Sequence, residues 1–206
     1  MYVPQHFADT DVARLHALMR AHAFATLISV ADGAPFATHI PLLLDAERGP
    51  LGTLIGHVAR ANSHWQAFDG RSLALAIFHG PHAYVSPRWF ASTPNVPSWN
   101  YEVVHASGPP RLLEDPARVR ALLERSAARF EAGAKEPWTL ASVPENYVAG
   151  MQRAIVAFEI PIDRLEGKRK LSQNKSEADR AGIAAGLRAE GRADGIAIAT
   201  AMELPS

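Results

Sequence analysis

The sequence has 206 residues, of which 48% are hydrophobic and 20% charged, values typical of a globular chain and not of a largely disordered one. It contains no cysteine, which excludes disulfides and thiolate metal sites and favours a reducing, cytoplasmic location. Its 21 basic and 21 acidic residues cancel, so it lacks the net positive charge typical of nucleic-acid-binding proteins. No stretch approaches the roughly 20 apolar residues of a membrane span, and no apolar segment follows a basic start as in a secretory signal.

The first half of the chain predicts one helix followed by several strands. Residues 10–22 place apolar side chains at helical spacing, with Asp9 or Thr10 as the N-cap. Strand-like runs cover 25–30, 36–44 and 51–58, and Asp32-Gly33 between the first two predicts a tight hairpin. Further strand-like runs at 73–79 and 83–86 flank Gly80-Pro81, which predicts a turn between them.

The second half mixes strands and helices. Strands are predicted at 101–106 and 154–162, and Asp115-Pro116 predicts the start of a helix that ends at Gly133. Ser176-x-x-Asp179 resembles a capping box that opens a helix through 187, with a stop at Gly191. The pattern does not decide the secondary structure of residues 194–204. Because the strands do not alternate regularly with helices, we expect a single α+β barrel domain over 1–206, with a C-terminal helical segment at about 176–204.

Polar side chains are dense where the strand ending near 58 gives way to a short helix. The segment contains, in order, His57, Arg60, Asn62, Ser63 and His64. A phosphate monoester is well bound by a guanidinium, neutral donors and free backbone N–H groups at a helix N-terminus, and this segment offers all three. The alternative is that Asn62 or Ser63 caps the helix while Arg60 lies in solvent, and composition alone favours that alternative.

The segment from Phe78 to Pro87 contains two histidines, His79 and His82, around the predicted turn. Their spacing is that of a metal pair, but no carboxylate lies nearby and the chain has no cysteine, so a zinc site is not favoured. No Gly-x-Ser-x-Gly sequence occurs, so the nucleophile elbow of a serine hydrolase is not predicted. Two interpretations remain open: a hairpin that lines a ligand pocket, and ordinary histidines at strand ends.

Two further segments combine aromatic and polar side chains. Trp99, Asn100 and Tyr101 lie beside a predicted strand, where a flat heterocycle would stack and form hydrogen bonds, although a tryptophan also serves as a core or dimer anchor. The run 168–175 combines cations with neutral donors before a helix, and its alternative interpretation is a solvated loop.

Six ordered motifs resemble the PaiB family, described as FMN-binding negative transcriptional regulators. The domain of that family is a split β-barrel related to pyridoxamine-phosphate oxidases and flavin reductases. The resemblance spans nearly the whole chain, and its carriers are Tyr2-Val-Pro-x-x-Phe7, His39-Ile-Pro-Leu-Leu-Leu-Asp45, Gly56-His-Val-Ala-Arg-Ala-Asn62 with Trp65, Phe78 to Pro87, Pro97-x-Trp-Asn-Tyr101 with Val104-His-Ala106, and Lys170-Leu-Ser-Gln-Asn174.

The resemblance implies a homodimer with two FMN sites in the interface, each lined by both subunits. It implies that Arg60 and Asn62 contact the phosphate, with His57 and Ser63 beside them. One strand segment would run beside the flavin ring and turn backbone groups toward its pyrimidine edge: His39, Ile40, Pro41 and Leu42. The remaining contacts would come from the other subunit: Trp99, Asn100, Tyr101, Lys170, Ser172, Gln173 and Asn174.

Function stays open between two classes. The resemblance implies a negative transcriptional regulator, in which flavin occupancy or redox state changes the dimer and its interaction with DNA. The charges do not support DNA binding, because the helix with Arg118, Arg120 and Arg125 also carries Glu124. The alternative is a flavin-dependent oxidoreductase or flavin reductase acting on a small molecule or NAD(P)H, with His79, His82 or Tyr101 as proton donors. A haem protein is a third, less favoured interpretation, because the sequence identifies no axial ligand.

Overall fold

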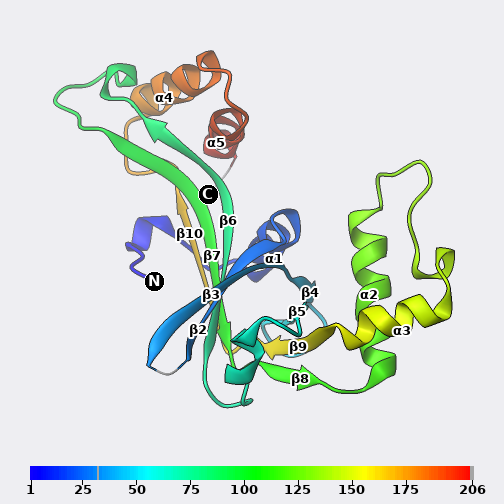
Figure 1. Cartoon of the computed structure of the whole chain (residues 1–206). Helices are drawn as coiled ribbons and strands as arrows, with labels where there is room; N and C mark the ends of the chain where they lie inside the picture. Colours follow the sequence, from blue (N-terminus) through cyan, green and yellow to red (C-terminus); the bar gives the residue numbers. More distant parts are fainter. Residues whose placement is uncertain (32, 205–206) are drawn as a thin grey trace. The chain divides into compact units, whose positions relative to one another are not determined.

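The computed structural model describes residues 1–31 and 33–204 and divides into two compact units (Figure 1). Unit 1 comprises Met1–His22, Phe78–His105 and Glu166–Ser206, and unit 2 comprises Ala23–Ile77 and Ala106–Leu165. Three strands have residues in both units: β6 (Ala74–Val85), β7 (Ser98–Gly108) and β10 (Arg164–Lys170). Over the described ranges, no helix combines the length and apolar character needed to cross a bilayer.

The strands of unit 2 form a hairpin and a separate four-stranded sheet. Strands β2 (Phe24–Ala31) and β3 (Ala34–Pro41) pair antiparallel with Thr26 opposite His39, and Gly33 adopts a φ of 77°, as a tight hairpin turn requires. Asp32 of the predicted turn lies outside the described residues. The second sheet has the order β4 (Leu43–Asp45), β5 (Thr53–Ala59), β9 (Ile155–Pro161) and β8 (Arg111–Leu113), with antiparallel neighbours.

The helices of unit 2 begin where the sequence provides caps. Helix α2 (Pro116–Phe130) starts after Asp115, whose carboxylate accepts a hydrogen bond from the backbone N–H of Ala117. Its apolar side packs against the second sheet. Helix α3 (Glu145–Arg153) precedes β9, and two 3-10 turns complete the unit, η2 (Ser63–Ala67) and η4 (Leu140–Ser142).

Unit 1 combines strands in the order β1 (Ala8–Asp9), β10, β7 and β6 with helices and 3-10 turns from both ends of the chain. Helices α4 (Glu177–Ala189) and α5 (Ala193–Glu203) form a core with Ala83 and Val85 of β6. Ser176 caps α4, and Gly191 takes a φ of 68° in the turn between the helices, as the capping box and glycine stop predicted. The other elements are η1 (Gln5–Phe7), α1 (Val12–Ala21) and η3 (Pro87–Trp89).

The α+β class is confirmed, but the predicted turn at Gly80-Pro81 is wrong. Strand β6 runs through these residues without a break. The pairing of β6 with β2 covers only Leu75–Ile77, so the missing N–H of Pro81 removes no bond to that neighbour. The buried positions change parity at this point, from Ala76 and Phe78 to Ala83 and Val85, so the strand changes the face that it buries.

Three local boundaries also differ from the predictions. The N-cap of α1 is Asp11, because its carboxylate, and not that of Asp9, accepts from the N–H groups of Ala13 and Arg14. The strand predicted at 36–44 is divided after Pro41. Residues 168–170 belong to β10 and not to a loop, because Lys168 pairs with Ala8 of β1.

The start of η2 is attached to the hairpin by His64, whose side chain is fully buried in unit 2. Its Nε2 lies 2.7 Å from Ser29 Oγ of β2, and its Nδ1 lies 2.8 Å from Thr38 Oγ1 of β3. Thr38 Oγ1 also accepts from Asn62 Nδ2 at 3.2 Å, and Asn62 Oδ1 accepts from the N–H of His64 at 3.0 Å. These bonds form a closed circuit, which we call the His64 circuit, and burial lowers the pKa of its imidazole.

We expect His64→Gln to lower the free energy of unfolding by about 1 to 3 kcal/mol, because buried hydroxyl groups lose a well-placed partner. Burial also lowers the pKa values of His57 and His105. Since the unfolded chain binds protons below about pH 6.5 more readily than these buried rings do, wild-type stability should fall as the pH falls below that value. The variant should lose less stability over the same range. Urea unfolding at about pH 7.5 and about pH 5.5 measures both effects.

His6→Gln, at an exposed position, controls for the loss of an imidazole as such. A His64→Gln variant whose stability falls with acid as steeply as the wild type would contradict the assignment of this ring as a buried neutral group.

Candidate functional site

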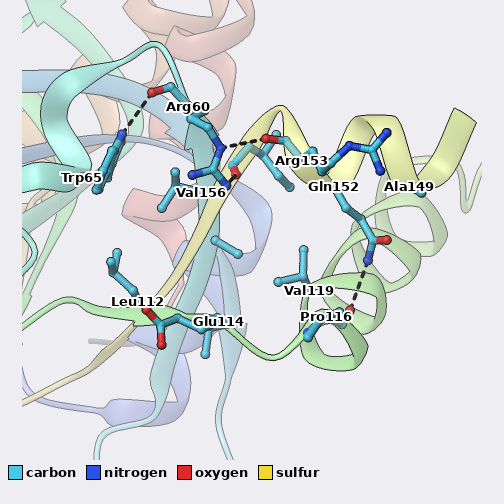
Figure 2. Close-up of a pocket in the computed structure, with 13 residues that line it drawn as sticks. Arg60, Trp65, Leu112, Glu114, Pro116, Val119, Ala149, Gln152, Arg153 and Val156 are labelled. Carbon is cyan, nitrogen blue, oxygen red and sulfur yellow. Dashed lines mark hydrogen bonds between the residues drawn. The ribbon is translucent and has the colours of Figure 1, made fainter.

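Arg60 follows β5 and turns its guanidinium toward the junction of α3 and β9 (Figure 2). Its Nε donates to the carbonyl of Arg153 at 2.7 Å, and its Nη2 donates to the carbonyl of Ile155 at 2.8 Å. The Trp65 indole Nε1 donates to the backbone carbonyl of Arg60 at 3.0 Å. Both acceptors of the guanidinium are neutral, so among the described residues Arg60 is held in place by backbone carbonyls and not by a carboxylate that would balance its charge.

Asn62 caps η2, which confirms the capping alternative for this residue. Its side chain bonds to Thr38 of β3, whereas that of Arg60 bonds to the α3–β9 junction, so the two predicted phosphate contacts are anchored to different elements. The side chain of Arg60 is exposed, as the alternative interpretation expected, but a hydrogen bond holds its guanidinium in place. Ser63 is exposed at the first position of η2.

The segment predicted to run beside the flavin ring, His39–Leu42, consists of the last three residues of β3 and the residue after it, and its side chains alternate between exposed and buried positions. His39 and Pro41 are exposed, whereas Ile40 and Leu42 are buried in the core of unit 2. Thr26 Oγ1 of β2 lies 3.1 Å from His39 Nδ1 and orients the imidazole. His57 lies half-buried on β5, and the structure gives it no polar contact that would define a role.

A cavity of about 310 Å³ in unit 1 brings Lys170, Ser172 and Asn174 together with Lys175. The Lys170 Nζ donates to Ser98 Oγ and to the carbonyl of Trp99, and burial together with Lys168 lowers its pKa. The Lys175 Nζ donates to Asn95 Oδ1 at 3.1 Å. Since these acceptors are neutral oxygens, the cavity retains positive charge.

Several predicted donors in unit 1 already form internal bonds. Asn100 is buried, and its Nδ2 donates to Ser172 Oγ at 3.0 Å, while Ser172 adopts a φ of 60°. Gln173 closes the same loop through the N–H of Leu171 and the carbonyl of Arg169. Tyr101 is half-buried with the Lys168 ammonium 5.3 Å from its ring centre. Trp99 and Asn174 remain exposed.

The two histidines of β6 lie on an exposed surface of unit 1. His82 and Tyr84 flank Trp99 of β7, with ring centres 6.2 and 6.1 Å from the indole. Trp99 is 52% exposed. Within the part of the chain that the structure describes, no three His, Cys, Asp or Glu side chains are grouped as a metal site would require. The hairpin predicted here is wrong, because β6 continues through Gly80 and Pro81 without interruption.

Sequence reasoning missed two residues near the predicted phosphate segment. His64 was visible only as one more polar residue in a dense run, although the two aromatic residues that follow it, Trp65 and Phe68, are compatible with burial of this segment. Thr38 lies in the middle of a strand and carries no motif signal. The pairing of β2 with β3 brings Ser29 and Thr38 within reach of one imidazole, and local sequence does not encode that proximity.

The residues at the start of η2 fit a phosphate monoester. They offer an unneutralised guanidinium, a short amide side chain and an exposed hydroxyl within four positions: Arg60, Asn62 and Ser63. A planar guanidinium suits two phosphate oxygens at once, and neutral donors add hydrogen bonds without repelling the charge. This donor set agrees with the phosphate group of FMN.

Comparisons with known proteins agree with this chemistry. Residues 1–164 match the family described as "Putative FMN-binding domain". The chain is 31% identical over 179 residues to Protease synthase and sporulation protein PAI 2 of Bacillus subtilis, covering 87% of this chain and 85% of that protein. It is 29% identical over 226 residues to uncharacterized protein AN0679 of Emericella nidulans, covering 91% and 90%.

Two solved structures are similar in fold. The FAD and heme binding protein from Mycobacterium smegmatis has a TM-score of 0.59 at 22% identity, covering 87% of this chain and 80% of that one. The flavocytochrome Anf3 from Azotobacter vinelandii has a TM-score of 0.63 at 16% identity, covering 87% and 78%. These likenesses concern the fold alone and confirm the predicted α+β split β-barrel. By sequence, the chain belongs to the PaiB family of proteins with an FMN-binding domain, and its cofactor is FMN.

Proposed function

We propose that this protein is a homodimer that holds FMN at its subunit interface and acts as a negative transcriptional regulator. The observation that carries the proposal is an exposed apolar face in unit 2, formed by β2, β3 and the first residues of β6. We call it the open face, and its apolar members are Phe24, Ile28, Val30, Pro35, Ala37, Pro41, Leu75 and Ile77.

Strand register defines the open face. In β2, Phe24 and Val30 are 68% and 63% exposed, whereas the alternate residues Ala25 and Leu27 are buried. Pairing places Phe24 opposite Pro41 and Ile28 opposite both Ala37 and Leu75. Contiguous exposed apolar patches of this kind mark interaction sites, and a second copy of the same patch is the simplest complement.

The open face also includes the strand predicted to lie beside the flavin. The Thr26–His39 pair is the polar feature among its apolar members, and Pro41 lies two positions beyond His39 on the same side. Burial of this face against a second copy would enclose His39 and Pro41 and exclude water from a ring beside them. Dimerisation and flavin binding would then share one surface.

We expect Val30→Glu to convert the dimer to a monomer, because it places a charge in an apolar interface without disturbing the core. Analytical ultracentrifugation should show the mass falling by half. Ile196→Glu, at a 44% exposed position of α5, is the matched control and should leave the mass unchanged. A Val30→Glu protein with the wild-type mass would place the interface elsewhere.

In the proposed site, Arg60, Asn62 and Ser63 bind the phosphate, and the segment His39–Leu42 lies along the ring. The partner subunit contributes the members of the other two segments that are not buried: Trp99, Tyr101, Lys170, Gln173 and Asn174. Lys170 of that second segment and Lys175, the residue after it, support this assignment, because their ammonium groups donate to neutral oxygens and suit an anionic ligand. When bound, FMN supplies the redox chemistry, while the protein supplies position and electrostatics.

We expect Arg60→Ala to weaken FMN binding roughly tenfold or more, since a lost charge-assisted hydrogen bond costs about 1.5 to 3 kcal/mol. Arg60→Lys keeps the charge without the planar fork and should show an intermediate affinity. Titration followed by flavin fluorescence measures the dissociation constant, and a thermal melt checks the fold. Arg71→Ala, at an exposed arginine of unit 2, is the control. Wild-type affinity in Arg60→Ala would remove Arg60 from the phosphate site.

The regulatory part of the proposal rests on membership of the PaiB family, described as negative transcriptional regulators. Two helical surfaces, those of α2 and α5, give little support to DNA binding. Arg118, Arg120 and Arg125 of α2 form ion pairs with carboxylates, so their charges are balanced. Helices α4 and α5 are joined by a three-residue turn containing Gly191, as in a helix-turn-helix, but α5 contains two acids and no lysine or arginine. DNA would therefore have to contact other surfaces.

We expect the FMN-loaded protein to shift promoter DNA of its own operon in a gel, with an affinity that falls steeply as salt rises. The flavin-free protein is the internal control and should bind with a different affinity. Absence of any shift at low salt, from protein whose flavin spectrum proves it loaded, would contradict regulation by direct DNA binding. That result would favour the flavin-dependent oxidoreductase.

A further inference from the structure

We propose that a second cavity, lined within unit 2 by residues of α2, α3, β8 and β9 together with Arg60 and Trp65, binds a small amphipathic carboxylate (Figure 2). The ligand would have a compact hydrophobic body and a single negative charge. The cavity has a volume of about 520 Å³, within the range of small-molecule sites in proteins. The proposal concerns a ligand other than FMN, and it shares one residue with the proposed function, because Arg60 lines this cavity and is also the proposed contact of the FMN phosphate.

The walls of this cavity suit a hydrophobic body. Val119 of α2, Leu112 of β8 and Ile155 of β9 line it with aliphatic surface. Trp65 forms a further wall, and its indole is fixed by the hydrogen bond to the carbonyl of Arg60. Removing an apolar body from water against such walls supplies most of the affinity of a small ligand.

The charges at the rim suit one carboxylate. The lining contains the guanidinium groups of Arg60 and Arg153 and the carboxylate of Glu114, which together leave one positive charge. Among the described residues, no ion pair joins either arginine to an acid. A monoanion balances that charge, whereas a phosphate dianion exceeds it.

The cavity is held open by hydrogen bonds before any ligand arrives. Gln152 Nε2 of α3 donates to the carbonyl of Pro116 of α2 at 3.1 Å, which joins the two helices at the rim. Arg60 is fixed by the carbonyls of Arg153 and Ile155, and its Nη1 still has donors to offer. A site ordered in advance loses less conformational entropy when a ligand binds.

Two probes of equal size test the proposal: 1-naphthoate, which is anionic, and 1-naphthamide, which is neutral. Isothermal titration of the full-length protein freed of flavin, in which no phosphate engages Arg60, should show that naphthoate binds more tightly than naphthamide, with a preference that shrinks as salt rises. Arg153→Gln should weaken naphthoate alone, roughly two- to fivefold, as expected for a partly exposed ion pair. Arg71→Gln should weaken neither probe.

Ala149→Phe should fill the cavity from α3 and weaken both probes at least tenfold, and Ala149→Leu repeats the test with a smaller change if the first variant melts early. Equal binding of the two probes to the wild type, or unchanged binding in a folded Ala149 variant, would overturn the proposal. Loss of FMN binding with naphthoate binding intact would contradict only the proposed function.

Discussion

The hydrogen bonds of His64 are the constraint on which the predicted flavin segment depends. One buried imidazole joins β2, β3 and the start of η2, and Asn62 closes the circuit by bonding to Thr38 and to the His64 backbone. Without this attachment, Asn62 and Ser63 would lose their link to the hairpin, and a loop that is not anchored orients donors poorly. The ring also separates Phe36 from Phe68, so the same residue supports apolar packing and polar connectivity. In this protein, the order of the candidate site originates in the core.

Local signals predicted the parts of the fold that depend on neighbours in sequence. Asp115-Pro116 and Ser176 begin helices because a cap acts within three residues, and Gly33 marks the hairpin because only the local backbone decides its φ. The turn predicted at Gly80-Pro81 was wrong because its outcome depends on contacts that are distant in sequence. Whether a proline breaks a strand depends on which neighbour it faces, and the short pairing of β2 with β6 is a property of the assembled sheet.

The same distinction applies to the candidate site. Residue type identified Arg60, Asn62 and the lysines of the 168–175 run as suitable for an anion, and the structure places Lys170, Ser172 and Asn174 around one cavity. Sequence could not tell that the side chains of Arg60 and Asn62 bond to different elements, or that Asn100 is used within the core of unit 1. These outcomes depend on partners more than 20 positions away, which no spacing rule reaches.

The interleaved course of the chain has a consequence for how the protein can be divided. The family match ends at residue 164, yet the hydrophobic core of unit 1 includes Leu171, Ile183 and Ile198. A fragment cut at the end of the match would leave Ala83 and Val85 of β6 without the helices that cover them. The end of the family match is therefore not the end of a folding unit. A truncated fragment would expose an apolar surface, prone to aggregation, that is buried in the whole chain.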